Sequence, residues 1–349
     1  MPQTWQWQLR SRPQGLPTYK GANPTFELVR KELPTVKYGQ ILIKVQYFSN
    51  DPAQRGWIDY YPDESRLYAP VIHEGDCMQA FALAEVVESK AENIKKGDFV
   101  TGSTGWTQYS VVEAKAVRLL EPLPNNLPIT HYLGALGLTG LTAYSGLIEV
   151  ARATKDDIVV VSGAAGATGS MVIQIAKKIL GCKKVIGIAG GAKKCEWVKR
   201  LGADECVDYK SADFQEQLTK ATPKFANVYF DNVGGEILDF MLTRLARNGR
   251  VASCGTISKY NATEAEKGEL LKNWFQIISM RLQIRGFIVL DHMERFSQIM
   301  QEFRKALEEG KLDITEGEQV VETRFEDIPG TWLKLFEGVN TGKLITKVV

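Results

Sequence analysis

The stretch VVVSGAAGATGS at residues 159–170 joins an apolar run to a segment of helical character, Met171 to Leu180. A strand that turns tightly through small residues into a helix lets a pyrophosphate approach the backbone and bind the free amides at the helix N-terminus. Gly166 and Gly169 take the second and third places of the pattern G-x-G-x-x-G, and Ala164 replaces its first glycine. The stretch predicts a dinucleotide-binding turn; a tight turn without a ligand is the alternative.

Beyond this stretch, apolar runs alternate with helical segments. The runs are KVIGIAG (184–190), ECVDY (205–209), NVYFDNVG (227–234), RVASCG (250–255) and LQIRGFIVL (282–290). Strands that alternate with helices form parallel sheets, because each crossover helix packs on a face of the sheet and returns the chain to the same end. The pattern predicts a doubly wound parallel α/β sheet of the Rossmann kind, and it favours the nucleotide-binding interpretation of the turn.

The two ends of the chain differ from this middle part. From Trp5 to about Leu120 the apolar runs are short and separated by turn residues, which is typical of a β-rich, barrel-like unit. The tail from about Leu312 returns to short strand-like pieces. We therefore predict a nucleotide-binding domain, residues 132–305, inserted in a discontinuous β-rich domain formed by residues 1–131 and 306–349.

Composition and charge favour a folded protein that binds small ligands. The 349 residues suffice for about two domains, and 44% of them are hydrophobic. The formal net charge of +2 provides no basic field for nucleic acid or for an acidic membrane surface. The uncharged stretch 122–148 is interrupted by Pro, Asn, Gly and Thr, so we do not expect it to span a membrane.

The cysteines and the amino end bear on the compartment. No C-x-x-C pair occurs among Cys77, Cys182, Cys195, Cys206 and Cys254. This pattern fits neither a disulfide framework nor a zinc knuckle. The initial MPQTWQWQLR resembles neither a secretory signal nor a transit peptide. We therefore expect a reducing compartment and a cytoplasmic location.

The end of the second expected strand indicates which dinucleotide binds. In NAD sites an Asp or Glu about 20 residues beyond the glycines binds the ribose hydroxyls. Here KVIGIAG ends in Gly190, and Lys193 and Lys194 follow shortly after. Without a carboxylate to repel it, the 2′-phosphate of NADP suits this site. Two lysines at the solvated start of a helix are the alternative.

Eight segments, in chain order, resemble one protein family. They are DPAQR (51–55), LGALGLTGLTAY (133–144), AAGATG (164–169), KCEWVKRLGADECVDYK (194–210), NVGG (232–235), NGRVASCGTISKYN (248–261), GFIV (286–289) and NTGK (340–343). The chain resembles the zinc-independent medium-chain dehydrogenase/reductase superfamily, in its leukotriene hydroxydehydrogenase, prostaglandin reductase and alkenal double-bond reductase branch. The resemblance implies a Rossmann domain inserted in a GroES-like catalytic domain, and NADPH as the cofactor.

The resemblance also implies which residues contact the cofactor. Lys194 and Tyr209 match the region that holds the 2′-phosphate, and Cys254 matches a position that lines the nicotinamide pocket. The implied cofactor-binding residues are Asn50, Ala165, Gly166, Thr168, Gly169, Gly190, Lys194, Tyr209, Asn232, Cys254, Gly255, Ser258, Tyr260, Phe287, Ile288, Val289, Asn340 and Gly342.

By the same resemblance, Tyr260 in ISKYN is the candidate catalytic residue, near the nicotinamide ribose and the substrate carbonyl oxygen. A phenol there can donate a hydrogen bond to an oxygen on which negative charge develops. A tyrosine that only closes the loop after the fifth strand is the alternative.

The function that the resemblance implies is NADPH-dependent reduction of the carbon–carbon double bond of α,β-unsaturated ketones or aldehydes, with hydride transfer to the β-carbon. A quinone reductase of the same superfamily is an alternative. A second alternative is a crystallin-like protein with a structural or RNA-binding role, against which the near-zero net charge argues.

We expect no catalytic zinc. The residues His73-Glu74-Gly75 resemble the Gly-His-Glu of zinc-dependent alcohol dehydrogenases, in which two cysteines complete the metal ligands. The segment 46–56 contains no cysteine, and only Cys77 lies close to His73 in sequence.

We expect a homodimer. The apolar strand predicted over Gln283–Leu290 is the last of the nucleotide-binding sheet, and edge strands are usually covered or paired. Two such edges related by a two-fold axis would form one continuous sheet, which also fits the resemblance.

Overall fold

The computed structural model describes residues 2–61, 63–263, 266 and 271–349, and it divides the chain into two compact units. The β unit comprises Met1–Leu133, Gln319–Asn340 and Leu344–Val349. The α/β unit comprises Gly134–Glu318 and Thr341–Lys343. The limits of folding domains given above, at residues 131/132 and 305/306, remain a prediction.

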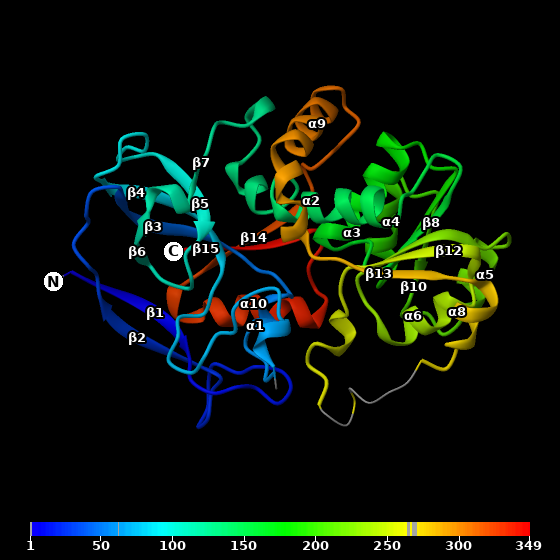
Figure 1. Cartoon of the computed structure of the whole chain (residues 1–349), viewed down its shortest axis with the longest axis horizontal. Coiled ribbons are helices and arrows are strands. Elements are labelled where there is room, and N and C mark those ends of the chain that lie inside the picture. Colours follow the sequence, from blue (N-terminus) through cyan, green and yellow to red (C-terminus); the bar gives the residue numbers. More distant parts are fainter. Residues whose placement is uncertain (1, 62, 264–265, 267–270) are drawn as a thin grey trace. The chain divides into compact units, whose positions relative to one another are not determined.

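The α/β unit is built on a sheet of six parallel strands in the order β10-β9-β8-β11-β12-β13 (Figure 1). The strands are β8 (Ile158–Val161), β9 (Lys184–Ala189), β10 (Glu205–Asp208), β11 (Ala226–Asp231), β12 (Leu245–Ser253) and β13 (Gln283–Gly286). The order reverses between β8 and β11, and doubly wound sheets bind ligands at such a switch point, beyond the carboxyl ends of the strands. The predicted Rossmann-type sheet is confirmed.

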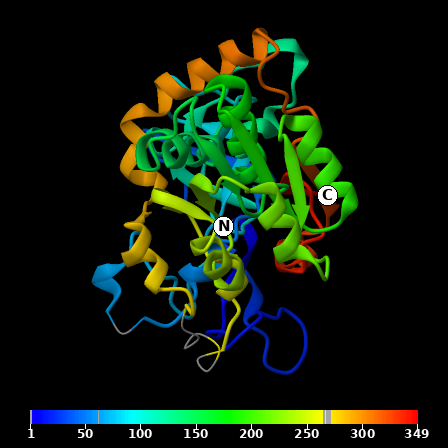
Figure 2. The ribbon, with the colours of Figure 1, turned by 90° about the vertical axis from the view of Figure 1, so that its right-hand side faces the viewer.

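Helices cover both faces of this sheet (Figures 1 and 2). They are α2 (Leu138–Tyr144), α3 (Ala167–Gln174), α4 (Ala192–Leu201), α5 (Phe214–Ala221), α6 (Gly235–Leu242), α8 (Phe275–Met280) and α9 (Phe296–Glu308). Leu218 of α5 and Met241 of α6 belong to one buried cluster with Val160 and Ile186 of the central strands. Among the described residues, no helix has both the length and the apolar character needed to cross a bilayer.

Two elements differ from the expectation. The helix expected over residues 168–180 is α-helical to Gln174 and continues as a π-helical segment, η6 (Ile175–Ile179). The strand expected over residues 283–290 ends at Gly286, and a 3₁₀ segment, η8 (Val289–Arg295), follows. Phe287 packs edge-on against Phe230 of β11, with ring centroids 6.2 Å apart. This long-range aromatic contact takes the chain out of the sheet edge, so an apolar run overstates the length of the strand.

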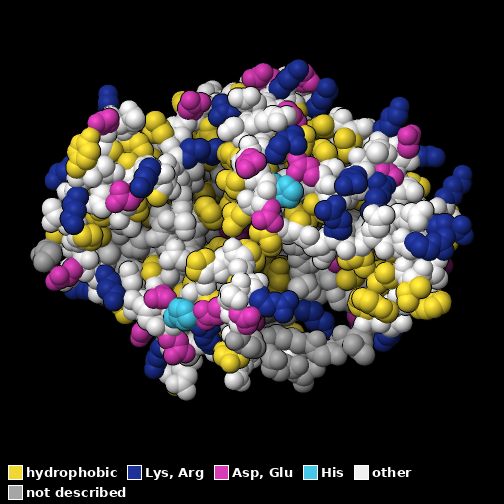
Figure 3. Space-filling view, viewed as in Figure 1, with side chains coloured by type: hydrophobic (Ala, Val, Ile, Leu, Met, Phe, Trp, Pro, Cys, Tyr) yellow, Lys and Arg dark blue, Asp and Glu magenta, His cyan; other side chains and the backbone are white. Residues whose placement is uncertain are grey.

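Apolar side chains remain at the surface next to the sheet edge. Figure 3 shows hydrophobic groups gathered over α8. The exposed fractions of Trp274, Phe275 and Ile278 are 58%, 69% and 63%. All four residues of β13 are exposed as well, and β13 is the last strand of its sheet.

The β unit contains a seven-stranded sheet that joins distant parts of the chain. Its order is β14-β15-β3-β4-β5-β7, with β6 paired to β3. The strands are β3 (Gln40–Ser49), β4 (Phe81–Ser89), β5 (Phe99–Ser103), β6 (Tyr109–Glu113), β7 (Arg118–Leu119), β14 (Glu318–Thr323) and β15 (Lys343–Val348); a separate hairpin pairs β1 (Gln3–Leu9) with β2 (Phe26–Glu32). Because the last strand, β15, pairs antiparallel with β3, the β-rich fold is discontinuous in sequence, as predicted.

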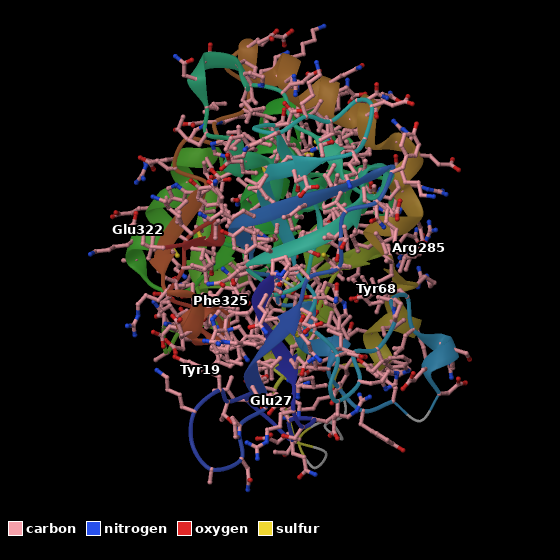
Figure 4. The ribbon with its side chains drawn as sticks, turned by 90° about the vertical axis from the view of Figure 1, so that its left-hand side faces the viewer. Tyr19, Glu27, Tyr68, Arg285, Glu322 and Phe325 are labelled. Carbon is pink, nitrogen blue, oxygen red and sulfur yellow. The ribbon has the colours of Figure 1, made fainter. Side chains whose placement is uncertain are left out.

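Aromatic side chains fill the core of the β unit. The rings of Phe26, Trp106 and Trp332 meet edge to face, with centroids 5.2 to 6.0 Å apart. Trp332 belongs to α10 (Ile328–Glu337). Trp7 packs against Tyr19 and donates its indole N–H to the carbonyl oxygen of Phe325 at 2.9 Å; Figure 4 marks Tyr19 and Phe325. These contacts hold the carboxyl-terminal segment on strands from the start of the chain.

The DPAQR segment forms a buried corner of the β unit. The short helix α1 (Gln54–Trp57) contains Arg55, whose side chain is buried. Its Nη2 donates to the carbonyl oxygens of Pro13 and Gly15 at 3.2 Å each. Burial lowers the pKa of Arg55, and the nearby Asp59 opposes this effect. The segment therefore anchors the loop around Pro13 and Gly15.

Candidate functional site

The predicted phosphate turn connects β8 to α3. A Cβ placed on Gly169 would lie 2.3 Å from the carbonyl oxygen of Gly163, so helix and turn approach more closely than any side chain allows. Gly163 has a φ of +58°. The amide of Gly342 donates to the carbonyl oxygen of Ala165 at 2.8 Å, and Gly342 pairs with Gly166 in an isolated bridge. The structure thus brings Gly342 to a turn of small residues, the kind of turn at which dinucleotide-binding folds hold a diphosphate.

The end of β9 forms a second part of the site, with Gly190 and Tyr209 in contact. A Cβ placed on Gly190 would lie 2.8 Å from Cε1 and 3.0 Å from the hydroxyl oxygen of Tyr209, so the phenol ring lies directly over the glycine. The amide of Tyr209 donates to the carbonyl oxygen of Ala189 at 3.0 Å. A flat, small-residue floor beside a phenol is suited to the ribose of a nucleotide.

Cations converge beside this floor. Lys194, in the first turn of α4, is half-buried, and its pKa is lowered, first by burial and then by the charge of Lys210. Two like charges near one another favour an anion between them. Asp208 lies close in sequence, and its Oδ1 accepts hydrogen bonds from the amides of Gly191 (2.8 Å) and Lys210 (2.9 Å). The carboxylate of Asp208, the last residue of β10, is therefore hydrogen-bonded to backbone amides.

The NVGG loop and the segment 254–260 form the third part of the site. The amide of Ser258 donates to the carbonyl oxygen of Val233 at 3.2 Å, and its hydroxyl donates to the same oxygen at 2.6 Å. The amide of Thr256 donates to the hydroxyl oxygen of Tyr260 at 3.4 Å. A Cβ placed on Gly255 would lie 3.0 Å from that oxygen. The Tyr260 hydroxyl thus lies over backbone at the carboxyl end of β12.

Cys254 begins this segment and carries a neutral thiol. Burial, and to a lesser extent Asp231, raise the pKa of Cys254 to about 12. A thiol with so high a pKa is a poor nucleophile near neutrality. The structure therefore supports a packing role for this side chain.

Phe287, Ile288 and Val289 follow β13 and are half-buried. A Cβ placed on Gly146 would lie 2.4 Å from Cζ of Phe287, so the ring packs directly on the helix that contains this glycine. Glu149 of the same π-helical segment, η5 (Ser145–Val150), holds the chain beyond Val289 by contacts of 2.6 Å with His292 Nδ1 and with Arg295 Nη1. The segment 287–289 is thereby anchored at both ends.

Two of the predicted cofactor residues belong to the β unit. Asn50 is buried, and its Nδ2 donates to the carbonyl oxygen of Leu344 (3.3 Å) and to Oγ1 of Thr346 (3.0 Å). Asn340 ends the second segment of the β unit and directly precedes Thr341 of the α/β unit. Roles of Asn50 and Asn340 toward the cofactor remain predictions.

The residues near His73 form a surface cluster. Nδ1 of His73 lies 3.3 Å from Nη2 of Arg12, and Nε2 lies 3.5 Å from Glu64 Oε2. Burial raises the pKa of Cys77 to about 12. Within the described ranges, no group of three or more His, Cys, Asp or Glu side chains is arranged to hold a metal ion.

Sequence reasoning missed three residues of the site. Asp208 and Asp231 each end a parallel strand, and the charge of Lys210 acts on Lys194 and contributes to lowering its pKa. An acidic residue at the carboxyl end of a strand was a signal for the first two, since these ends line the ligand crevice. For Lys210 no local signal exists, because its neighbour is 16 positions away in the chain.

Fold and site together define a class. The turn at Gly163–Gly169 joins a strand to a helix through small residues, as diphosphate-binding turns do, Gly190 lies against the ring of Tyr209, and Lys194 and Lys210 supply positive charge nearby. These residues fit NADP(H). The α/β unit is that of a dinucleotide-dependent oxidoreductase.

Comparison with known proteins gives the family. Residues 5–120 match the model described as N-terminal domain of oxidoreductase, and residues 167–305 match that described as zinc-binding dehydrogenase. The chain is 36% identical to prostaglandin reductase 1 of Bos taurus over 352 residues, covering 98% of each chain. It is 35% identical to the NADPH-dependent curcumin reductase of Escherichia coli (strain K12), covering 98% of this chain and 96% of the relative. Among solved structures, CurA of Vibrio vulnificus in complex with NADPH superposes with a TM-score of 0.87 at 34% identity, with 99% of both chains covered.

The chain belongs to the zinc-independent branch of the medium-chain dehydrogenase/reductase superfamily. The predicted family, fold and NADP-dependent oxidoreductase class are confirmed. The assignment of individual residues to cofactor and substrate rests on geometry and remains a proposal.

Proposed function

We propose that this protein uses NADPH to reduce the carbon–carbon double bond of α,β-unsaturated ketones or aldehydes. The observation that carries the proposal is the Tyr260 hydroxyl, which accepts a hydrogen bond from the Thr256 amide next to the NVGG loop. A hydroxyl that accepts a hydrogen bond becomes a better donor through polarisation. The similarity to a curcumin reductase and to a prostaglandin reductase supports reduction of a small organic substrate.

NADPH, when bound, supplies the hydride. The protein's part is orientation and electrostatics. Lys194 and Tyr209 would bind the 2′-phosphate, and the turn at Ala165–Gly169 would bind the diphosphate at the N-terminus of α3, where the first amides of the helix have no partner within it. The neutral Cys254 provides a small apolar surface beside the reacting ring.

Tyr260 acts on the substrate oxygen. When hydride reaches the β-carbon of an enone, negative charge moves to the carbonyl oxygen as an enolate. Donation from the Tyr260 hydroxyl stabilises that charge. Tyr260 or solvent then returns a proton to the α-carbon, which gives the saturated carbonyl compound.

Product analysis tests the reaction class. Purified protein should oxidise NADPH with a conjugated enone and yield the saturated ketone, with deuterium from labelled cofactor at the β-carbon. An allylic alcohol as the product would contradict the proposal. Quinones, assayed at the same concentrations, should be reduced more slowly; faster turnover of quinones would favour a quinone reductase.

The protein also forms a homodimer in this proposal. The exposed edge strand β13 and the apolar residues Trp274, Phe275 and Ile278 of the adjacent segment support it, because exposed strand edges and apolar patches mark association sites. Light scattering at micromolar concentration should give twice the 38.9 kDa chain mass. A monomer under these conditions would contradict the dimer.

A cytoplasmic location completes the proposal. All five cysteines are free thiols, as a reducing compartment favours. Cell fractionation should recover the activity with cytosolic markers; recovery with a secreted fraction would contradict the location.

A further inference from the structure

Asp231, the last residue of β11, is 1% exposed, and one of its carboxylate oxygens accepts four hydrogen bonds. Oδ1 accepts from the hydroxyls of Ser162 (3.0 Å) and Tyr229 (2.8 Å) and from the amides of Val233 (3.1 Å) and Gly234 (3.0 Å). A buried carboxylate needs donors to replace its lost water, and hydrogen bonds to a charged acceptor are stronger than neutral ones. The carboxylate is therefore a junction for four groups of the α/β unit.

Two of these donors belong to the NVGG loop. Because both amides point at Asp231, the carboxylate determines how the chain leaves β11. Gly234 then has a φ of +66°, and a Cβ on it would lie 2.4 Å from Oγ1 of Thr256. The loop therefore packs directly on the segment that leads to Tyr260, and it has little freedom to shift without a clash.

Ser162 extends the junction to the phosphate turn. Its hydroxyl donates to Asp231 and accepts the amide hydrogen bond of Asn232 at 2.9 Å. Nδ2 of Asn232 donates to the carbonyl oxygen of Ser162 at 2.7 Å. Since Ser162 directly precedes Gly163, these three bonds set the position of the NVGG loop relative to the turn that binds the diphosphate.

The loop in turn holds the segment of Tyr260. The carbonyl oxygen of Val233 accepts two hydrogen bonds from Ser258, and that of Asn232 accepts one from the amide of Ile257 at 3.4 Å. The backbone oxygen of Asp231 itself accepts from the amide of Cys254 at 2.9 Å. Hydrogen bonds thus connect the phosphate turn through Asp231 and the NVGG loop to residues 254–258, and the backbone of this segment continues to the candidate proton donor, Tyr260.

We propose that Asp231 is a positioning residue of this enzyme: its carboxylate aligns the phosphate turn, the NVGG loop and the Tyr260 segment, so that cofactor bound at the turn is correctly placed toward Tyr260. Asp231 does not itself touch substrate or cofactor. The catalytic part of this inference rests on the proposed function, whereas the binding part rests only on the use of NADP(H).

The variant Asp231→Asn in the full-length protein tests the inference, because it keeps the shape of the side chain and removes its charge. The affinity for NADPH, followed by nucleotide fluorescence, should fall about tenfold. The affinity for 2′,5′-ADP, which carries only the adenosine half, should change by less than about twofold. The matched variant Asp208→Asn, altered at the end of β10, should show the reverse pattern, with the larger loss for 2′,5′-ADP.

Turnover provides the second measurement. With a conjugated enone, kcat of Asp231→Asn should fall about tenfold, and the isotope effect with deuterated NADPH should rise, because misalignment slows the hydride step. Equal losses of affinity for NADPH and 2′,5′-ADP would overturn the inference and leave Asp231 a folding residue. Unchanged NADPH affinity together with an unchanged isotope effect would overturn it too. If the wild-type protein reduces no enone, the proposed function fails. The affinities of Asp231→Asn for NADPH and for 2′,5′-ADP then still test whether Asp231 positions the cofactor.

A second variant covers the case in which Asp231→Asn does not fold. Ser162→Ala leaves the carboxylate and three of its donors in place but removes two of the three hydrogen bonds that link the NVGG loop to the phosphate turn. NADPH affinity should fall about threefold, with 2′,5′-ADP affinity unchanged. Wild-type NADPH affinity in a folded Ser162→Ala protein would overturn the inference.

Discussion

The two ends of the cofactor site are constructed in opposite ways. Beyond β9 and β10, Lys194 is half-buried and Tyr209 and Lys210 are exposed, so recognition depends on side chains that solvent can reach. Beyond β11 and β12, a buried carboxylate and a series of backbone hydrogen bonds hold the NVGG loop and the Tyr260 segment. The first end is suited to distinguishing one nucleotide from another, and the second to holding reacting groups in place.

The physical reason is the different demand on each end. A phosphate is attracted by any nearby cation, and this attraction tolerates shifts of an ångström because it falls slowly with distance. Hydride transfer requires reacting atoms at close and defined separation, so small displacements are costly. Substitutions at the exposed end should therefore alter the choice between NADPH and NADH, whereas those at the buried end should alter turnover and the binding of the part of NADPH beyond its adenosine half.

The largest expected effect is at the buried end. Tyr260→Phe keeps the ring and removes the hydroxyl, so kcat with an enone should fall by about two orders of magnitude. The KM for NADPH should stay within about twofold, because the phosphate contacts are elsewhere. Steady-state kinetics with the purified variant measures both. An unchanged kcat would leave Tyr260 as a loop residue.

The next effect is at the exposed end. Lys194→Ala should raise the KM for NADPH by about ten- to a hundredfold and leave the KM for NADH nearly unchanged, since only NADPH carries the 2′-phosphate. Lys210→Ala, an exposed cation in the same corner, should raise the KM for NADPH by about two- to fivefold. If both cofactors lost affinity equally in Lys194→Ala, the variant would have damaged the fold instead.

A smaller effect should follow from the floor of the ribose site. In Gly190→Ala the new methyl group would lie 2.8 Å from the ring of Tyr209, so the phenol must move away. The preference for NADPH over NADH should fall about fivefold, comparable to the loss of one neutral hydrogen bond. The double variant Gly190→Ala/Tyr209→Ala should lose little more of the preference for NADPH over NADH than Tyr209→Ala alone. If the losses of the two single variants add up in the double variant, the two residues act independently.

The smallest effect concerns pH. Burial and the charge of Lys210 lower the pKa of Lys194, so its ammonium group loses its proton at a lower pH than an exposed lysine would. As the pH is raised, the KM for NADPH should therefore begin to increase before the usual lysine pKa of ~10.4 is reached, by about twofold at first. A pH profile of Lys194→Arg provides the control, because arginine keeps its charge. Parallel profiles for the wild type and this variant would argue against titration of Lys194.

Several site features were predictable because they depend on neighbouring residue types. Gly166 and Gly169 mark the phosphate turn, and the absence of an acid after KVIGIAG indicated NADP. The role of Asp231 was not predictable in this way. Its donors include Ser162, which lies 69 positions earlier in the chain, and no local pattern relates the two. The same limit applies to Lys210 and to the early end of β13 at Gly286, where packing against Phe230 intervenes.

Local residue patterns were thus sufficient for the alternation of strands and helices, the nucleotide-binding turn and the cofactor class. Each of these follows from hydrophobic periodicity, backbone freedom or charge within a short window. The alignment of the turn with the NVGG loop and Tyr260 required the folded chain. Hydrogen bonds such as that from Ser162 to Asp231 form only after separate strands pair, and a carboxylate is shielded from water only after the helices cover the sheet.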